Sequence, residues 1–113
     1  MHELSLMEAL RPLVLREAAR AGGRRITGLH LRLGELAGVE PAALDLAATV
    51  VLADTIAAGA RLMVEVVPAA GCCGGCGRSV PLPGGVGRCP CGAAGAIRVV
   101  QGMELQLVGL DLL

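Results

Sequence analysis

The stretch Gly71-Cys72-Cys73-Gly74-Gly75-Cys76-Gly77 contains a Cys-x2-Cys pair, and Cys89-Pro90-Cys91-Gly92 follows it after a spacer of 12 residues. The window 71–95 holds all five cysteines, nine of the 17 glycines and three of the six prolines. A segment of this composition buries too little apolar surface to become ordered alone, so it needs an external staple. Closely paired thiolates on two turns are ligands that tetrahedral zinc prefers. The stretch therefore predicts a zinc-ribbon-like module.

The expected zinc ligands are Cys73, Cys76, Cys89 and Cys91. The second pair is unusual, because one residue separates its cysteines where a zinc knuckle usually has two. Cys72 is therefore a reserve ligand that could replace one of the four or exchange with it. The window contains no His, Asp or Glu, which argues against a catalytic zinc. A redox dithiol or a catalytic cysteine is a weaker alternative, since no helix N-terminus and no pattern of nearby cations marks a lowered thiol pKa. The simplest alternative is a glycine-rich segment with incidental thiols.

Length and composition limit the classes of protein that remain. A chain of 113 residues suits one compact domain, or a small domain that carries a metal-stapled module. Ten Lys and Arg residues balance ten Asp and Glu residues, and there is no Phe, Tyr or Trp. A neutral chain without aromatic stacking groups is a poor candidate for binding nucleic acid or anionic membranes.

No targeting or spanning segment is expected. The longest strongly apolar run, 46–53, is far shorter than the roughly 20 residues that cross a bilayer. The first residues lack the basic start and the apolar stretch of a secretory signal. We therefore expect a cytoplasmic protein, and in that reducing compartment clustered cysteines indicate metal or redox chemistry rather than disulfides.

Apolar residues outside the cysteine window recur at spacings that indicate two helices and three strands. The first helix is expected to begin after Ser5, which could form a capping box with Glu8, and to end at Gly22-Gly23. The second is expected to begin at Pro41, a residue well suited to the first helical position, and to run to about residue 53. Alternating patterns predict strands at 25–33, 62–67 and 97–108, the last with a bend or bulge at Gly102.

This order of elements predicts an α+β fold. Two helices on one face of a three-stranded sheet are the economical packing. The expected division is a discontinuous α/β part, 1–68 and 97–113, with the metal module 69–96 inserted between its two segments.

The amino-terminal end offers a second set of metal ligands. The α-amine of Met1, the peptide nitrogen after it and the imidazole of His2 lie within reach of one ion. Such nitrogen sets favour square-planar Ni(II) or Cu(II) over Zn(II). On this chemistry alone, an exposed terminal residue is the simpler interpretation of His2. His30 lies on the polar side of its predicted strand and is expected to be an ordinary surface residue.

Several stretches together resemble one family, the hydrogenase nickel-incorporation proteins HypA/HybF. The opening Met-His-Glu and the cysteine spacing are the specific features. The stretches that carry the resemblance, in order along the whole chain, are Met1-His2-Glu3-Leu4-Ser5, Ile26-Thr27-Gly28-Leu29-His30-Leu31-Arg32-Leu33-Gly34-Glu35-Leu36, Gly38-Val39-Glu40-Pro41, Gly59-Ala60-Arg61-Leu62, the cysteine module and Gly102-Met103-Glu104-Leu105.

The resemblance implies a metallochaperone and not an enzyme. Proteins of this family deliver nickel to the precursor of the nickel–iron hydrogenase large subunit, together with a nickel-handling GTPase, and some also serve urease. It implies nickel at His2, with the Met1 amine and the Glu3 backbone, and structural zinc at four cysteines. The family's usual fourth cysteine falls at Gly92, so Cys91 is a departure in register. Monomer and homodimer both stay open.

Three rival classes remain from the residues alone. A zinc-ribbon module that binds protein or nucleic acid without delivering nickel is the main alternative. A small thiol enzyme would lose its activity on mutation of one cysteine and would bind no stoichiometric metal. An inert structural subunit would bind zinc but not nickel.

Overall fold

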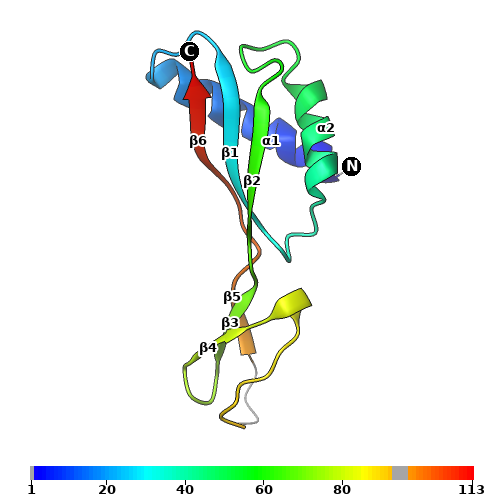
Figure 1. The fold of residues 1–113 in the computed structure, drawn as a ribbon, viewed down its shortest axis with the longest axis vertical. Coiled ribbons are helices and arrows are strands. Elements are labelled where there is room, and N and C mark those ends of the chain that lie inside the picture. Colours follow the sequence, from blue (N-terminus) through cyan, green and yellow to red (C-terminus); the bar gives the residue numbers. More distant parts are fainter. Residues whose placement is uncertain (1, 93–96) are drawn as a thin grey trace. The chain divides into compact units, whose positions relative to one another are not determined.

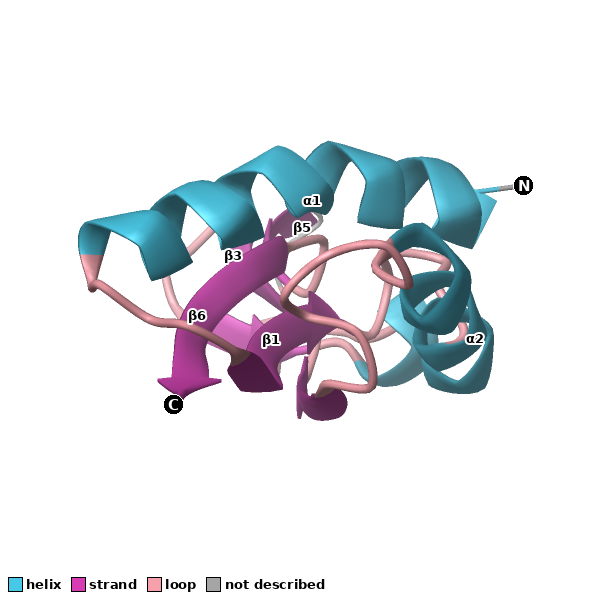
Figure 2. Ribbon diagram, turned by 90° about the horizontal axis from the view of Figure 1, so that it is seen from above, coloured by secondary structure: helices cyan, strands magenta, loops and turns pink. Residues whose placement is uncertain are grey.

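The computed structural model describes residues 2–92 and 97–113, and its elements follow one another in the predicted order. The first sheet has the strand order β2-β1-β6, and its strands are β1 (Ile26–Gly34), β2 (Arg61–Val67) and β6 (Leu105–Leu112). Helices α1 (His2–Arg20) and α2 (Pro41–Val51) pack on this sheet, as Figures 1 and 2 show. The α+β fold with two helices and a three-stranded sheet is confirmed.

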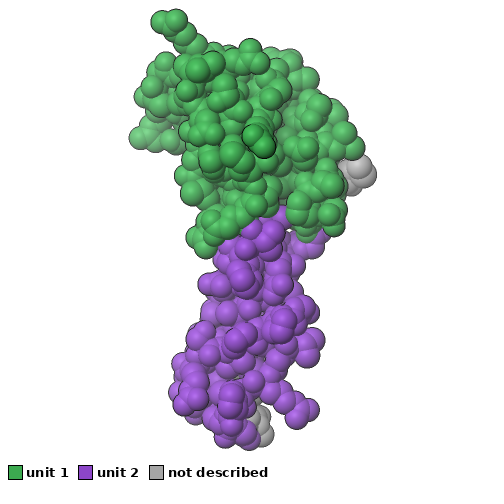
Figure 3. Space-filling model, viewed as in Figure 1, with its two compact units in different colours: residues 1–32, 39–65, 106–113 green, residues 33–38, 66–105 purple. Residues whose placement is uncertain are grey.

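The chain divides into two compact units, coloured separately in Figure 3. The first unit comprises 1–32, 39–65 and 106–113, and the second comprises 33–38 and 66–105. The second unit is thus larger than the segment 69–96 of the sequence-based division. It also contains β5 (Ile97–Gln101), because that strand pairs within the second sheet.

The core of the first unit is built from aliphatic side chains. Helix α1 buries Met7, Leu10, Val14 and Ala18, which recur every three or four residues on one face. Helix α2 adds a second set of buried side chains to this core, namely Leu44, Ala47 and Ala48. Strand β1 turns Leu29 and Leu31 toward this core, where each is about 2% exposed or less, and leaves His30 and Arg32 half-exposed on the opposite face.

Helix α1 differs from its predicted start. The helix begins at His2, so Ser5 lies inside it and the expected capping box does not mark its first turn. Pro12 lies within the helix at an exposed position, where the missing N–H removes one backbone hydrogen bond. The predicted end is confirmed: Gly22 has φ of 73°, and the N–H of Gly23 donates to the carbonyl of Ala18 at 3.0 Å.

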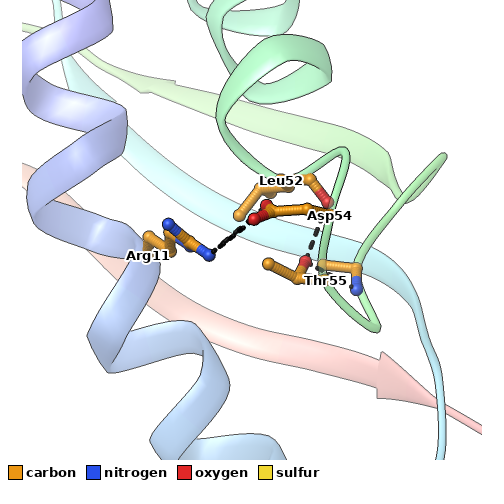
Figure 4. Close-up of polar contacts among 5 residues, drawn as sticks. Arg11, Leu52, Asp54 and Thr55 are labelled. Carbon is orange, nitrogen blue, oxygen red and sulfur yellow. Dashed lines mark hydrogen bonds and ion pairs between the residues drawn. The ribbon is translucent and has the colours of Figure 1, made fainter.

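One exposed ion pair joins α1 to the turn after α2 (Figure 4). Arg11 Nη2 lies 3.3 Å from Asp54 Oδ2. The hydroxyl of Thr55 donates to the carbonyl of Leu52 at 2.8 Å and accepts from the N–H of Ala57 at 3.0 Å, which closes that turn. Because both charged side chains are well exposed, the ion pair adds little stability, and burial of the apolar faces holds the helices together.

The second unit contains a three-stranded antiparallel sheet in the order β4-β3-β5. Its strands are β3 (Ala70–Cys73), β4 (Ser79–Pro81) and β5, with a short 3-10 helix at Pro83–Gly85. Among its described residues, a small buried cluster is formed by Ala69, Cys73, Val80 and Leu82, with Leu36, Cys89 and Ile97 half-buried against it. Such a small core leaves the unit dependent on a further cross-link.

The predicted final strand 97–108 is wrong as one element. Gly102, with φ of 110°, separates β5 from β6, and the two strands belong to different sheets. The alternating pattern runs on through the break, so periodicity alone could not reveal it. No helix among residues 2–92 and 97–113 combines the length and the apolar character that crossing a bilayer requires.

Candidate metal centre

Four of the five cysteines meet at one point of the second unit. The sulfur atoms of Cys73, Cys76, Cys89 and Cys91 all lie within 4.8 Å of one another. The Sγ atoms of Cys73 and Cys91 are 3.7 Å apart, and those of Cys76 and Cys89 are 3.5 Å apart. In tetrahedral zinc sites with Zn–S bonds of about 2.3 Å, sulfur atoms are about 3.8 Å apart. The four thiols therefore fit one tetrahedral ion.

The first pair sits on the turn that joins β3 to β4. The N–H of Gly77 donates to the carbonyl of Cys73 at 2.8 Å, and the N–H of Cys73 donates to the carbonyl of Arg78 at 2.9 Å. Gly77 has φ of 72°, a conformation that residues with a Cβ rarely adopt. The N–H of Gly75 points at Cys73 Sγ at 3.4 Å. The turn therefore supplies both thiols and a donor to a thiolate.

The second pair sits on a tighter turn. The N–H of Gly92 donates to the carbonyl of Cys89 at 3.2 Å, and Gly92 has φ of 71°. This closed turn brings both Cys89 and Cys91 to the cluster, although only Pro90 separates them. The short spacing is therefore compatible with a four-sulfur site.

The two thiols of the first pair have opposite pKa shifts. The backbone N–H groups of Cys76 and Gly75 stabilise the Cys73 thiolate and lower its pKa to about 6, despite its burial. The N–H of Arg78 lowers the pKa of Cys76, but the neighbouring thiol of Cys89, burial and the other two thiols outweigh it and raise that pKa to about 12. Without a metal, Cys73 therefore ionises readily, whereas ionisation of Cys76 is opposed. A bound cation would supply the charge that the remaining thiolates need.

Cys72 lies outside the cluster. It is half-buried on β3, and its Sγ approaches the carbonyl oxygen of Gly77 at 3.6 Å and that of Cys73 at 4.0 Å. Because residues alternate across a strand, Cys72 and Cys73 point to opposite faces of the sheet. The structure therefore brings together the four expected ligands and leaves the reserve candidate elsewhere.

The amino-terminal residues lie in the first unit. Met1, the residue whose amine the sequence suggests as a nickel ligand, lies outside the described residues. His2 is exposed in the first turn of α1, and Glu3 is half-exposed. In general, the first backbone N–H groups of an α-helix have no acceptor in a preceding turn. The exposed side chain of His2 is therefore open to a ligand from solvent.

A contact that sequence reasoning missed joins this end of α1 to the start of α2. Glu3 Oε2 accepts a long hydrogen bond, 3.5 Å, from the N–H of Glu40, the residue that precedes α2. These residues are 37 positions apart, and no local pattern could have paired them. The contact directs the carboxylate of Glu3 toward the second helix.

Comparison with known proteins gives a consistent result over the whole chain. A family model described as hydrogenase/urease nickel incorporation, metallochaperone, matches residues 1–112. The chain is 39% identical over 112 residues to the hydrogenase maturation factor HypA of Geobacter metallireducens, with 98% of each chain covered. It is 43% identical to HypA of a Synechococcus strain and 32% identical to HybF of Klebsiella pneumoniae, again with 98% of each chain covered.

Solved structures show the same fold. The solution structure of the nickel metallochaperone HypA from Helicobacter pylori matches with a TM-score of 0.71 at 18% identity, covering 98% of this chain and 97% of that one. A second solution structure, of a HypA protein, matches with a TM-score of 0.78 at 21% identity, covering 100% and 97%. At these identities the likeness shows the shared fold.

Proposed function

Because the chain belongs to the HypA family of metallochaperones for hydrogenase and urease nickel incorporation, we propose that it carries Ni(II) to the precursor of a nickel–iron hydrogenase large subunit. The observation that carries this proposal is the exposed His2 in the first turn of α1, in a chain that also gathers four thiols elsewhere. The family is one of metallochaperones, so the protein is not an enzyme. Urease is the second recipient that the family description names.

In this proposal nickel is cargo at the amino-terminal end. The ligands are the His2 imidazole, the Met1 amine and the backbone nitrogen of Glu3. Nitrogen donors in adjacent chelate rings favour a square-planar Ni(II) ion. Support comes from the exposure of His2 in the first helical turn. In helices generally, the first backbone N–H groups lack an acceptor within the helix.

An exposed site also suits transfer. A recipient can bring its own ligands to a nickel ion whose faces are open to solvent. Metal can then pass by stepwise ligand exchange, without release into bulk water. In this proposal the partners are a nickel-handling GTPase and the hydrogenase precursor. Nickel transfer takes place in the cytoplasm, where reducing conditions keep cysteine thiols reduced.

The cysteine cluster has a different role in the proposal. Cys73, Cys76, Cys89 and Cys91 would hold Zn(II), which cross-links a unit with few buried hydrophobic residues. The zinc is structural and is not delivered. Cys72 is assigned no ligand role, because its sulfur lies away from the cluster.

The test is metal analysis and nickel titration of the untagged protein, the His2→Ala variant and a protein with an N-terminal tag. His2→Ala and the tag should both abolish the square-planar nickel species with amide-nitrogen coordination, while zinc stays at one per chain. Cys72→Ser is the matched control and should change neither metal. Full retention of that nickel species in His2→Ala would refute the terminal site. Transfer to purified hydrogenase precursor and to urease apoprotein then separates the two recipients.

A further inference from the structure

The face of the first sheet that carries His30 presents a pair of ligand-type side chains. His30 of β1 and Asp111 of β6 lie with Nε2 and Oδ1 3.0 Å apart. Their side chains are 42% and 54% exposed, so the pair is open to solvent. The hydroxyl of Thr27 donates to the carbonyl of Asp111 at 3.3 Å, and the N–H of Leu113 donates to the carbonyl of Arg25 at 2.9 Å. The strands are therefore joined without the side-chain pair.

The end of a third side chain, Met63 of β2, lies close to the Asp111 carboxylate. A Cβ on Gly28 would lie 2.5 Å from Asp111 Oδ2 and 2.6 Å from the methyl carbon of Met63. The carboxylate and the thioether end of Met63 therefore fill the space above Gly28, which only a residue without a side chain leaves open. Strands β2, β1 and β6 lie side by side (Figure 1). They carry Met63, His30 and Asp111, whose sulfur, nitrogen and oxygen atoms are the candidate donors.

The spacing of the pair suits a metal ion in place of the shared proton. Two ligand atoms that each lie about 2.1 Å from one ion, at a right angle, are about 3.0 Å apart. Nε2 and Oδ1 already have that separation. An exposed histidine–carboxylate pair adds little stability, so exchanging its proton for a cation costs the fold little. Imidazole and thioether together favour late first-row ions such as nickel and copper.

The neighbouring charges permit a cation. The cation closest along the strand on this face, Arg32, lies 3.7 Å from Glu65 Oε2, so its charge is partly neutralised by that carboxylate. A surface cavity of about 260 Å³ is lined by His30, Met63 and the Arg32–Glu65 pair, among others, and gives water access to His30 and Met63. We propose that His30, Asp111 and Met63 form a second, solvent-accessible site for a divalent late first-row transition-metal ion, which shares no residue with the amino-terminal or the cysteine site.

The experiment uses the full-length, zinc-loaded His2→Ala protein and Ni(II) alone as the probe. One nickel ion is expected to bind, with imidazole nitrogen and one sulfur atom in its X-ray absorption spectrum. Paramagnetic broadening should centre on the amides of Gly28, His30 and Asp111. Because His2 is already absent, failure here is distinguishable from failure of the terminal nickel site.

Single substitutions in that background identify the ligands. His30→Gln and Asp111→Asn should each weaken nickel binding by roughly tenfold or more, and Met63→Leu should remove the sulfur signal. Val108→Ala, which changes the same cavity without removing a proposed donor or a charge, is the matched control and should bind as before. No nickel binding in the His2→Ala protein, or binding that survives His30→Gln unchanged, would overturn the site. Unchanged spectra in Met63→Leu would overturn the three-donor set.

Discussion

Cys91 and Cys72 have similar chemistry but different surroundings, and this difference predicts the result of replacing each. Cys91 Sγ lies 3.7 Å from Cys73 Sγ, whereas Cys72 Sγ lies against the carbonyl oxygen of Gly77 at 3.6 Å. We expect Cys91→Ser to lower the affinity for Zn(II) by about 10-fold or more, because one of four soft ligands is lost. Cys72→Ser should leave it unchanged. Competition with a chromophoric chelator measures both, and the reverse pattern would assign the fourth ligand to Cys72.

Gly34 and Gly109 form a second pair of sites whose substitution should have opposite effects. A Cβ on Gly34 would overlap the carbonyl group of Gly102, and backbone atoms cannot easily move aside. Gly34→Ala should therefore lower the free energy of unfolding by about 2 kcal/mol. A Cβ on Gly109 meets no heavy atom within 4 Å. Gly109→Ala should raise the free energy of unfolding by about 0.5 kcal/mol, since glycine is unfavourable inside a strand.

Denaturant titration of the zinc-loaded protein measures both changes. Equal destabilisation by the two substitutions would show that strand glycines in general, and not the close approach of two backbones, control the result. The comparison is informative because Gly34 lies at the end of β1 and Gly109 lies inside β6, so both replace a strand glycine by alanine.

At the scale of the element, the turn between β3 and β4 predicts the pH dependence of zinc binding. Cys76, with a pKa raised to about 12, is protonated in the metal-free protein, so zinc must displace its proton and affinity falls as pH falls. Cys73 has a pKa lowered to about 6, so above pH 6 its thiol is already ionised and zinc displaces no proton from it. Below pH 6 the thiol is protonated, and zinc must displace that proton as well. The slope of log affinity against pH should therefore steepen by about one proton below pH 6.

Calorimetry in buffers of different ionisation enthalpy, from pH 5 to 8, counts the protons released. A constant number of protons across that range would contradict the lowered pKa of Cys73. Cys72→Ser is again the control, because a thiol outside the cluster should not change the count.

Elements were predictable from the sequence where their signals are local. The end of α1 followed from Gly22-Gly23, and the start of α2 followed from Pro41, because backbone conformation at glycine and proline depends on the residue itself. The predicted start of α1 at Ser5 was wrong, because the helix already begins at His2. The break at Gly102 was predicted only as a bend, since which sheet a strand joins depends on distant partners.

The same contrast applies to the sites. The four clustered thiols could be predicted because both pairs lie on short turns of one segment. His30 was expected to be an ordinary surface residue because of its place on the polar side of a strand. Its hydrogen bond to Asp111, 81 positions away, has no local signal. Glu35 is a further example: its Oε1 accepts from the N–H of Ala69 at 2.8 Å across 34 positions. Single-sequence patterns carry no information on such pairs.

At the scale of the whole molecule, the two units differ in what stabilises them. The first unit buries rows of aliphatic side chains from α1, α2 and β1. Among the described residues of the second unit, the buried cluster is small, and one of its members is Cys73, which is also a proposed zinc ligand. Burial of so little apolar surface cannot offset the entropy of ordering the glycine-rich segment. Zinc binding free energy would therefore be folding free energy for this unit alone.

Removing zinc with a chelator should consequently unfold one unit and spare the other. Hydrogen exchange at the amides of β3 and β4 should accelerate toward unprotected rates, while the amides of α1 and the helix-facing core around Leu29 keep their protection. The first unit is thus an internal control within the same sample, and adding Zn(II) back should restore protection in the second. Loss of protection in both units together would show that the chain folds as one cooperative body and that zinc stabilises all of it.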